Sequence, residues 1–119
     1  MTDFDLPAPV SAYVAATNAF DIDAFMAIFA EDSLVNDHRN EFAGCEAIRA
    51  WAQREIIGDR VTMHVTGATR RGNAVAVTAK IDGNFDKTGL PDPLVLAFYF
   101  SIGHDRISQL IIVHNKPMA

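Results

Sequence analysis

The sequence has little of several features that mark common protein classes. It contains a single cysteine, Cys45, among 119 residues, so no internal disulfide can form. Disulfide frameworks belong to oxidising compartments, so this lone thiol favours a reducing one. The first residues are acidic and lack the basic and then apolar pattern of a secretory signal. We therefore expect a cytoplasmic protein.

Positive charge and long apolar runs are also scarce. Lys and Arg number 10 against 15 Asp and Glu, which gives a formal net charge of -5. A surface with this balance does not attract nucleic acid or an anionic membrane, so we expect neither as a partner. The longest purely apolar run, Leu94 to Phe100, is far too short to cross a bilayer.

Motifs for metals, phosphates and thiol chemistry are missing as well. The four histidines show no paired spacing such as His-Glu-x-x-His. The glycines occur singly rather than in a phosphate-binding loop, and Cys45 has no base beside it in the sequence. We therefore expect no metal site and no cofactor, and we interpret Cys45 as a structural residue.

The sequence does contain a change of hydrophobic period near residue 60. Before it, apolar residues recur at helical spacing in three stretches, 10–20, 22–29 and 48–56. After it, apolar and polar residues alternate, which predicts strands separated by turn signals, and the last two strands cover 94–102 and 107–114. A first strand is predicted at 33–38, followed by a loop to residue 44. Three helices followed by antiparallel strands predict a single α+β domain over residues 1–119, with the helices on one face of the sheet.

Asp37 is the first candidate functional residue. Val35 and Asp37 share one face of the predicted first strand, because strand side chains alternate. Val35 belongs in a core, and a carboxylate on the same face is costly unless it is paired or used. His38 should point to the opposite face, so we do not expect it to pair with Asp37. A strand-end carboxylate bonded to backbone or to Arg39 is the structural alternative.

Four segments resemble a known family: Tyr13–Asp21, Ala27–Asp32, Asn36-Asp37 and Gly44–Trp51. They are similar to the first half of SnoaL-like proteins of the nuclear-transport-factor-2-like superfamily, which also holds the ketosteroid isomerases. The resemblance covers residues 8–55, and the later strands match in number and length more than in motif. It implies a cone made of a curved, mainly antiparallel mixed sheet wrapped around three N-terminal helices.

The resemblance also implies roles for particular residues. Tyr13 matches the tyrosine that helps form the oxyanion hole of the isomerases, and Asp37 matches their general base. Leu96 falls where the isomerase has a second oxyanion donor, a carboxylic acid kept neutral by apolar surroundings. Leucine cannot donate a hydrogen bond, which argues against a steroid isomerase. His114 matches a cavity-facing aromatic and could supply an acid or base, and Trp51 falls where an aromatic lines the cavity.

We therefore expect Asp37, Tyr13 and His114 as catalytic residues in an apolar cavity. The expected ligand contacts are Trp51, Val35, Phe98, Leu96 and Ile112. Each polar candidate also has a structural interpretation: Tyr13 has the spacing of a core residue, and His114 could be a hydrogen-bonded core histidine.

Two functions agree with this pattern. The first is a cofactor-independent isomerase or cyclase that uses Asp37 as general base on an apolar, carbonyl-bearing compound, with Tyr13 stabilising the oxyanion. The second is a non-catalytic ligand-binding or protein-interaction module on the same fold, which the donor missing at Leu96 favours.

The last strands also predict assembly. The stretches 94–100 and 110–113 carry apolar residues on both strand faces, so both faces should be covered. One face covers the helices, and the other needs a partner because large exposed apolar patches are rare on monomers. We expect a homodimer with the two sheets facing each other, which the resemblance implies as well.

Overall fold

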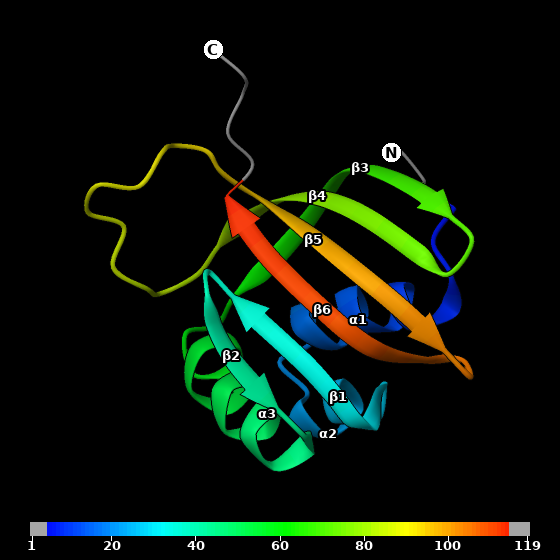
Figure 1. Cartoon of the computed structure of the whole chain (residues 1–119). Coiled ribbons are helices and arrows are strands. Elements are labelled where there is room, and N and C mark those ends of the chain that lie inside the picture. Colours follow the sequence, from blue (N-terminus) through cyan, green and yellow to red (C-terminus); the bar gives the residue numbers. More distant parts are fainter. Residues whose placement is uncertain (1–4, 115–119) are drawn as a thin grey trace.

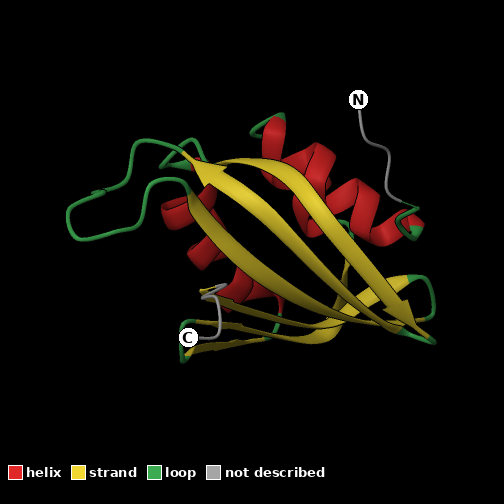
Figure 2. Cartoon of the chain, turned by 90° about the horizontal axis from the view of Figure 1, so that it is seen from above, coloured by secondary structure: helices red, strands yellow, loops and turns green. Residues whose placement is uncertain are grey.

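Six strands form one strongly curved sheet, and all helices lie on its concave side (Figure 1, Figure 2). This is a computed structural model, and it describes residues 5–114. The helices are α1 (Ala8–Asn18), α2 (Ile22–Met26) and α3 (Cys45–Ala52), with a π-helical extension η1 (Gln53–Ile57). The strands are β1 (Phe29–Asp37), β2 (Asn40–Ala43), β3 (Thr62–Arg71), β4 (Ala74–Asp82), β5 (Leu94–Gly103) and β6 (Arg106–His114). The predicted α+β cone is confirmed.

The sheet order is β2-β1-β6-β5-β4-β3. Among the described strands, only β1 and β6 pair in parallel, with Val35 opposite Leu110 and Asp37 opposite Ile112. The remaining pairs are antiparallel, so the sheet is mixed. The parallel pair places the end of β1, which carries Asp37, beside the end of the last strand.

Local irregularities help the sheet curve around the helices. The register between β3 and β4 shifts between Val65 and Gly67, which is the mark of a bulge. A Cβ added at Gly67 would lie 2.8 Å from the Thr78 hydroxyl oxygen, so only glycine allows this close approach without a shift. Bulges of this kind bend a strand and increase its twist.

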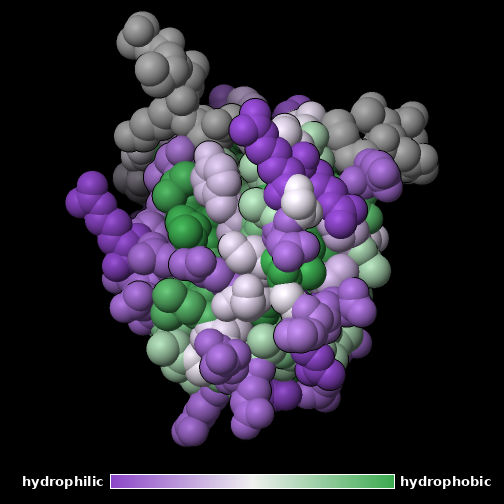
Figure 3. All heavy atoms as spheres, turned by 45° about the vertical axis from the view of Figure 1, so that its right-hand side comes forward, coloured by the Kyte–Doolittle hydropathy of each residue, from purple (hydrophilic) through white to green (hydrophobic). Residues whose placement is uncertain are grey.

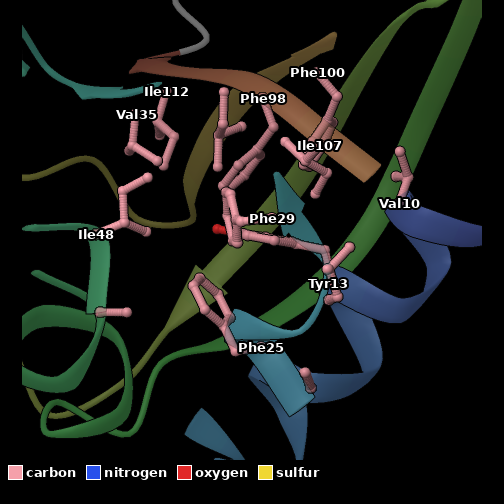
Figure 4. Packing of buried hydrophobic residues seen from close by; sticks show 14 of the residues in the cluster. Val10, Tyr13, Phe25, Phe29, Val35, Ile48, Phe98, Phe100, Ile107 and Ile112 are labelled. Carbon is pink, nitrogen blue, oxygen red and sulfur yellow. The ribbon is translucent and has the colours of Figure 1, made fainter. Parts of the chain in front are cut away.

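The core lies between α1, α2, α3 and the concave face of the sheet. Tyr13 sits at its centre, with ring centroids 5.0 Å from Phe25 and 5.2 Å from Phe100. Figure 4 shows the Tyr13 side chain running from α1 into this group of aromatic rings. Because the ring is held on several sides, the position of its hydroxyl is fixed by the core.

Two predicted boundaries are wrong. The second helix was expected to continue through Phe29, but it ends at Met26 and Phe29 begins β1. The backbone of Ile107 donates to the Ile28 carbonyl at 2.9 Å, so pairing with β6 prevails over the helical spacing. The segment expected to be a loop at 38–44 is instead a hairpin, in which β2 pairs with β1. Among the described residues, no helix is long and apolar enough to span a membrane.

Candidate functional site

The tight turn between β1 and β2 brings Asp37 and His38 together. His38 and Arg39 have φ values of 50° and 76°, so both residues of this turn have the left-handed backbone conformation of a primed hairpin turn. This turn ends strand alternation, and His38 Nδ1 lies 2.6 Å from Asp37 Oδ1. The expectation that these residues cannot pair is therefore wrong, because it assumed that His38 continues the strand.

Trp51 on α3 holds the other oxygen of the same carboxylate. Its indole Nε1 donates to Asp37 Oδ2 at 3.0 Å. The Trp51 side chain is fully buried, and its ring stacks on Phe42 with the centroids 5.8 Å apart. Both oxygens of Asp37 are thus engaged, one by a rigid buried donor and one by a histidine. The carboxylate cannot turn without losing one of these contacts.

Asp37 and His38 line a pocket of about 280 Å³ between α1, η1 and the sheet. Most of its wall is apolar and includes Leu96, Phe98 and Ile112. Tyr13, Thr17 and His114 add polar groups from α1 and β6. A mostly apolar hollow with a few converging polar groups is the usual form of a small-molecule site.

The electrostatic character of this pocket is negative. Glu55 and Asp59 line it together with Asp37, and none of the described residues in its wall is Lys or Arg. Burial, followed by the nearby negative charge of Asp37, raises the pKa of Tyr13 above its ordinary value. The Tyr13 hydroxyl therefore stays protonated and can act as a hydrogen-bond donor across the physiological range.

Two buried polar atoms in the pocket wall have no hydrogen-bond partner within the described part of the chain. They are Thr17 Oγ1 and His38 Nε2. His38 presents Nδ1 to Asp37, so Nε2 is the nitrogen that remains for a ligand. The His114 ring centroid lies 4.5 Å from that of His38, which places two imidazoles side by side.

Two of the expected ligand contacts do not line this pocket. Val35 shares a strand face with Asp37 but is fully buried in the core, deeper along β1. Trp51 lies behind Asp37 and orients it rather than forming the wall. Tyr13, Asp37, Leu96, Phe98, Ile112 and His114 all line the pocket.

Sequence reasoning missed His38 and Thr17 as site residues. Thr17 carried a usable signal, because it follows Tyr13 by four residues and so shares its helical face. His38 carried none, since neither residue of the His38-Arg39 turn is the Asn or Gly typical of primed turns.

A larger hollow of about 750 Å³ is lined by residues of β3, β4 and the loop between β4 and β5. It shares Phe85, Leu90 and Leu94 with the first pocket, together with Met63 and Ile81. Asp37, His38, Tyr13 and His114 do not line it, and the exposed Lys87 there is already paired with Asp82 at 2.6 Å. We therefore take the smaller pocket as the candidate site. Within residues 5–114, no group of three or more His, Cys, Asp or Glu side chains is placed to hold a metal ion.

Comparison with known proteins agrees with this architecture. A candidate polyketide cyclase from Sinorhizobium meliloti superposes with a TM-score of 0.84 and 29% identity, covering 95% of this chain and 100% of its own. A Catenulispora acidiphila protein of ketosteroid isomerase-like fold, solved with trimethylamine, gives a TM-score of 0.76 and 25% identity, covering 91% of this chain and 85% of its own. A cystatin-fold protein from Novosphingobium aromaticivorans superposes with a TM-score of 0.71 and 18% identity, covering 89% of this chain and 95% of its own. No curated protein matches the chain significantly.

The chain has the fold of nuclear-transport-factor-2-like and ketosteroid isomerase-like proteins. Within that class the assignment is more specific, because the sequence profile of the SnoaL-like domain matches residues 10–110. The chain belongs to the SnoaL-like domain family.

Proposed function

We propose that this protein binds a small, neutral, carbonyl-bearing compound in the Asp37 pocket and isomerises or cyclises it by proton transfer, without a cofactor. The observation that carries this proposal is the 2.6 Å contact between Asp37 Oδ1 and His38 Nδ1 in the pocket wall, which leaves the buried His38 Nε2 unpartnered within the described residues. A polar atom buried in this way is costly unless a ligand or a reaction uses it.

The size and charge of the pocket support this ligand class. Sites for drug-sized ligands start at about 300 Å³, so a pocket of about 280 Å³ suits a molecule of one or two rings. Glu55, Asp59 and Asp37 would repel an anionic ligand. The apolar wall favours a carbon skeleton, and the polar groups favour one or two oxygens on it.

The proton step follows from the hydrogen-bond arrangement. An ionised carboxylate only accepts hydrogen bonds, so Nδ1 of His38 is the donor in this contact, and in the neutral imidazole Nε2 then has the lone pair. Nε2 takes a proton from the carbon next to the carbonyl, and Asp37 stabilises the imidazolium that forms. The two residues thus act as one general base, which extends the prediction that Asp37 is the base.

The electrons of the broken C–H bond form the enolate, whose negative oxygen accepts a hydrogen bond from Tyr13. Return of the proton to another carbon of the conjugated system completes an isomerisation. In a cyclisation, the enolate carbon attacks a second carbonyl of the same molecule, and the alkoxide that forms takes the proton back from His38. His114, beside His38, is placed to pass the proton onward.

Deuterium incorporation tests the proposal without knowledge of the natural substrate. 2-Tetralone is a two-ring ketone with acidic α-hydrogens. In D2O, the protein should accelerate their exchange in NMR spectra, and His38→Gln should lose most of this activity. If the wild-type rate equals that of buffer for 2-tetralone and for a panel of one- and two-ring ketones, the proton-transfer proposal is wrong.

A second candidate function is a non-catalytic ligand-binding module. The observation that favours it is Leu96, which lines the pocket with an apolar side chain where the isomerases have a donor. Saturable binding of 2-tetralone without any exchange would support this function instead.

We further propose that the protein forms a homodimer through the convex face of the sheet. Tyr99 and Ile111 are cross-strand neighbours on this face, and Tyr99 is the most exposed large hydrophobic residue in the described part of the chain, at 48%. Part of the face is visible in Figure 3, where apolar and weakly polar side chains lie among hydrophilic ones. Sedimentation at micromolar concentration should give a dimer, and Ile111→Lys should give a monomer. A wild-type monomer would contradict this.

A further inference from the structure

Thr17 on α1 is a buried hydroxyl that the fold leaves unused. Its side chain is 1% exposed, and Oγ1 has no hydrogen-bond partner within the described residues. Thr17 lines the pocket and follows Tyr13 by one helical turn, so the two side chains stand on the same face of α1. A threonine in a helix commonly bonds to a backbone carbonyl one turn earlier, and Thr17 does not.

Unpartnered buried groups concentrate at this pocket. Within residues 5–114 three side chains carry one, namely Thr17, His38 and Ser33, and the first two line the pocket. Burial of a hydroxyl without a hydrogen bond costs free energy, so an unpartnered hydroxyl at a pocket wall is a candidate to hydrogen-bond with a molecule that enters the pocket. The two atoms lie on different elements, α1 and the turn after β1, and would contact different parts of one ligand.

We propose that Thr17 and Tyr13 together hold the carbonyl oxygen of the ligand, and that the ligand is therefore a ketone or conjugated enone oriented with its oxygen toward α1. This inference rests on the proposed ligand site. Two donors on one carbonyl oxygen make use of both of its lone pairs. The arrangement also supplies the second donor that Leu96 cannot provide. With the oxygen at α1, the neighbouring carbon faces the turn that carries His38.

2-Naphthol is a suitable probe, because it has the two rings and the oxygen position of the enol of 2-tetralone. Its binding should weaken about tenfold in Thr17→Val, which corresponds to the loss of one hydrogen bond in a buried site. Thr17→Ser should bind within about twofold of wild type, because it keeps the hydroxyl. Ser33→Ala is the matched control, since it removes the unpartnered hydroxyl that lies outside the pocket, and it should leave binding unchanged.

Thermal stability separates a ligand contact from a structural role. Valine has nearly the shape of threonine and needs no hydrogen bond, so Thr17→Val should keep or raise Tm in the absence of ligand. A fall in Tm together with unchanged naphthol affinity would overturn the inference, as would a wild-type protein that does not bind 2-naphthol.

The same experiments distinguish this inference from the proposed proton transfer. Thr17-dependent binding of 2-naphthol without any deuterium exchange of 2-tetralone would leave the oxygen site standing and remove the catalytic proposal. Rapid deuterium exchange at the same rate in wild type and in Thr17→Val would support the proton transfer and overturn the role of Thr17.

Discussion

Asp37→Asn should replace the carboxylate that accepts from His38 with an amide that can donate to it. The indole N–H of Trp51 can only donate, and it lies 3.0 Å from Asp37 Oδ2. An asparagine at this position must therefore turn its carbonyl oxygen toward Trp51 and its NH2 group toward His38. Nδ1 of His38, 2.6 Å from the other oxygen, then has to accept, and the hydrogen of the imidazole moves to Nε2.

The expected effect on the reaction is large and the effect on the fold is small. A histidine base held in the wrong tautomer loses about 10⁴-fold in rate in the best-studied case, and general base catalysis as a whole contributes about 10²–10⁴-fold. We expect a loss of at least 10²-fold in deuterium exchange of 2-tetralone. The variant keeps both hydrogen bonds in neutral form, so unfolding free energy should fall by only about 1 kcal/mol. Naphthol affinity should change little, because α1 is untouched.

Histidine ¹⁵N NMR measures the tautomer of His38, which is the proposed cause of the rate loss. In wild type the His38 spectrum should show a protonated Nδ1 and an unprotonated Nε2, and Asp37→Asn should reverse this pattern. Asp23→Asn is the matched control, because Asp23 is an exposed carboxylate that pairs with Arg49 away from the pocket. Unchanged exchange rates in Asp37→Asn, or a His38 tautomer that does not reverse, would refute the reasoning.

Two further predictions follow from the same contacts. Trp51→Phe removes a buried donor to a charged acceptor, so urea unfolding should show a loss of about 1.5–3 kcal/mol in unfolding free energy. A double-mutant cycle with Asp37→Asn should show coupling between the two sites. If the two losses are additive, the 3.0 Å contact contributes nothing to stability. The raised pKa of Tyr13 means that the folded state keeps this phenolic proton when the unfolded chain loses it. The unfolding free energy of the wild type should therefore fall above about pH 10, by up to about 1.4 kcal/mol per pH unit. The unfolding free energy of Tyr13→Phe, measured in urea between pH 9 and 11, should fall less steeply.

The fold could be predicted from the sequence because local and long-range signals agree. The helical spacing of Val10, Tyr13 and Thr17 and the alternation after residue 60 each specify one element type. The sequence signals gave the wrong element type where pairing with a distant strand determines the structure. Phe29 continues a helical pattern, yet the chain pairs with β6 there.

The candidate site was predictable only in part. Tyr13 and Asp37 are placed by regular periodicity, so their common pocket could be expected from sequence. The Asp37–His38 pair depends on two positive φ values in a turn without glycine, which no local pattern encodes. Trp51 was expected to line the cavity as an aromatic residue, but the structure uses its N–H group on the far side of Asp37.

The most direct test of the central claim is a crystal structure of the protein with 2-naphthol. The account predicts the naphthol rings between Phe98 and Ile112, the oxygen within hydrogen-bond distance of the Tyr13 and Thr17 hydroxyls, and the adjacent ring carbon facing His38 Nε2. Naphthol bound instead in the hollow beyond Phe85 and Leu90, or with its oxygen turned away from α1, would contradict it.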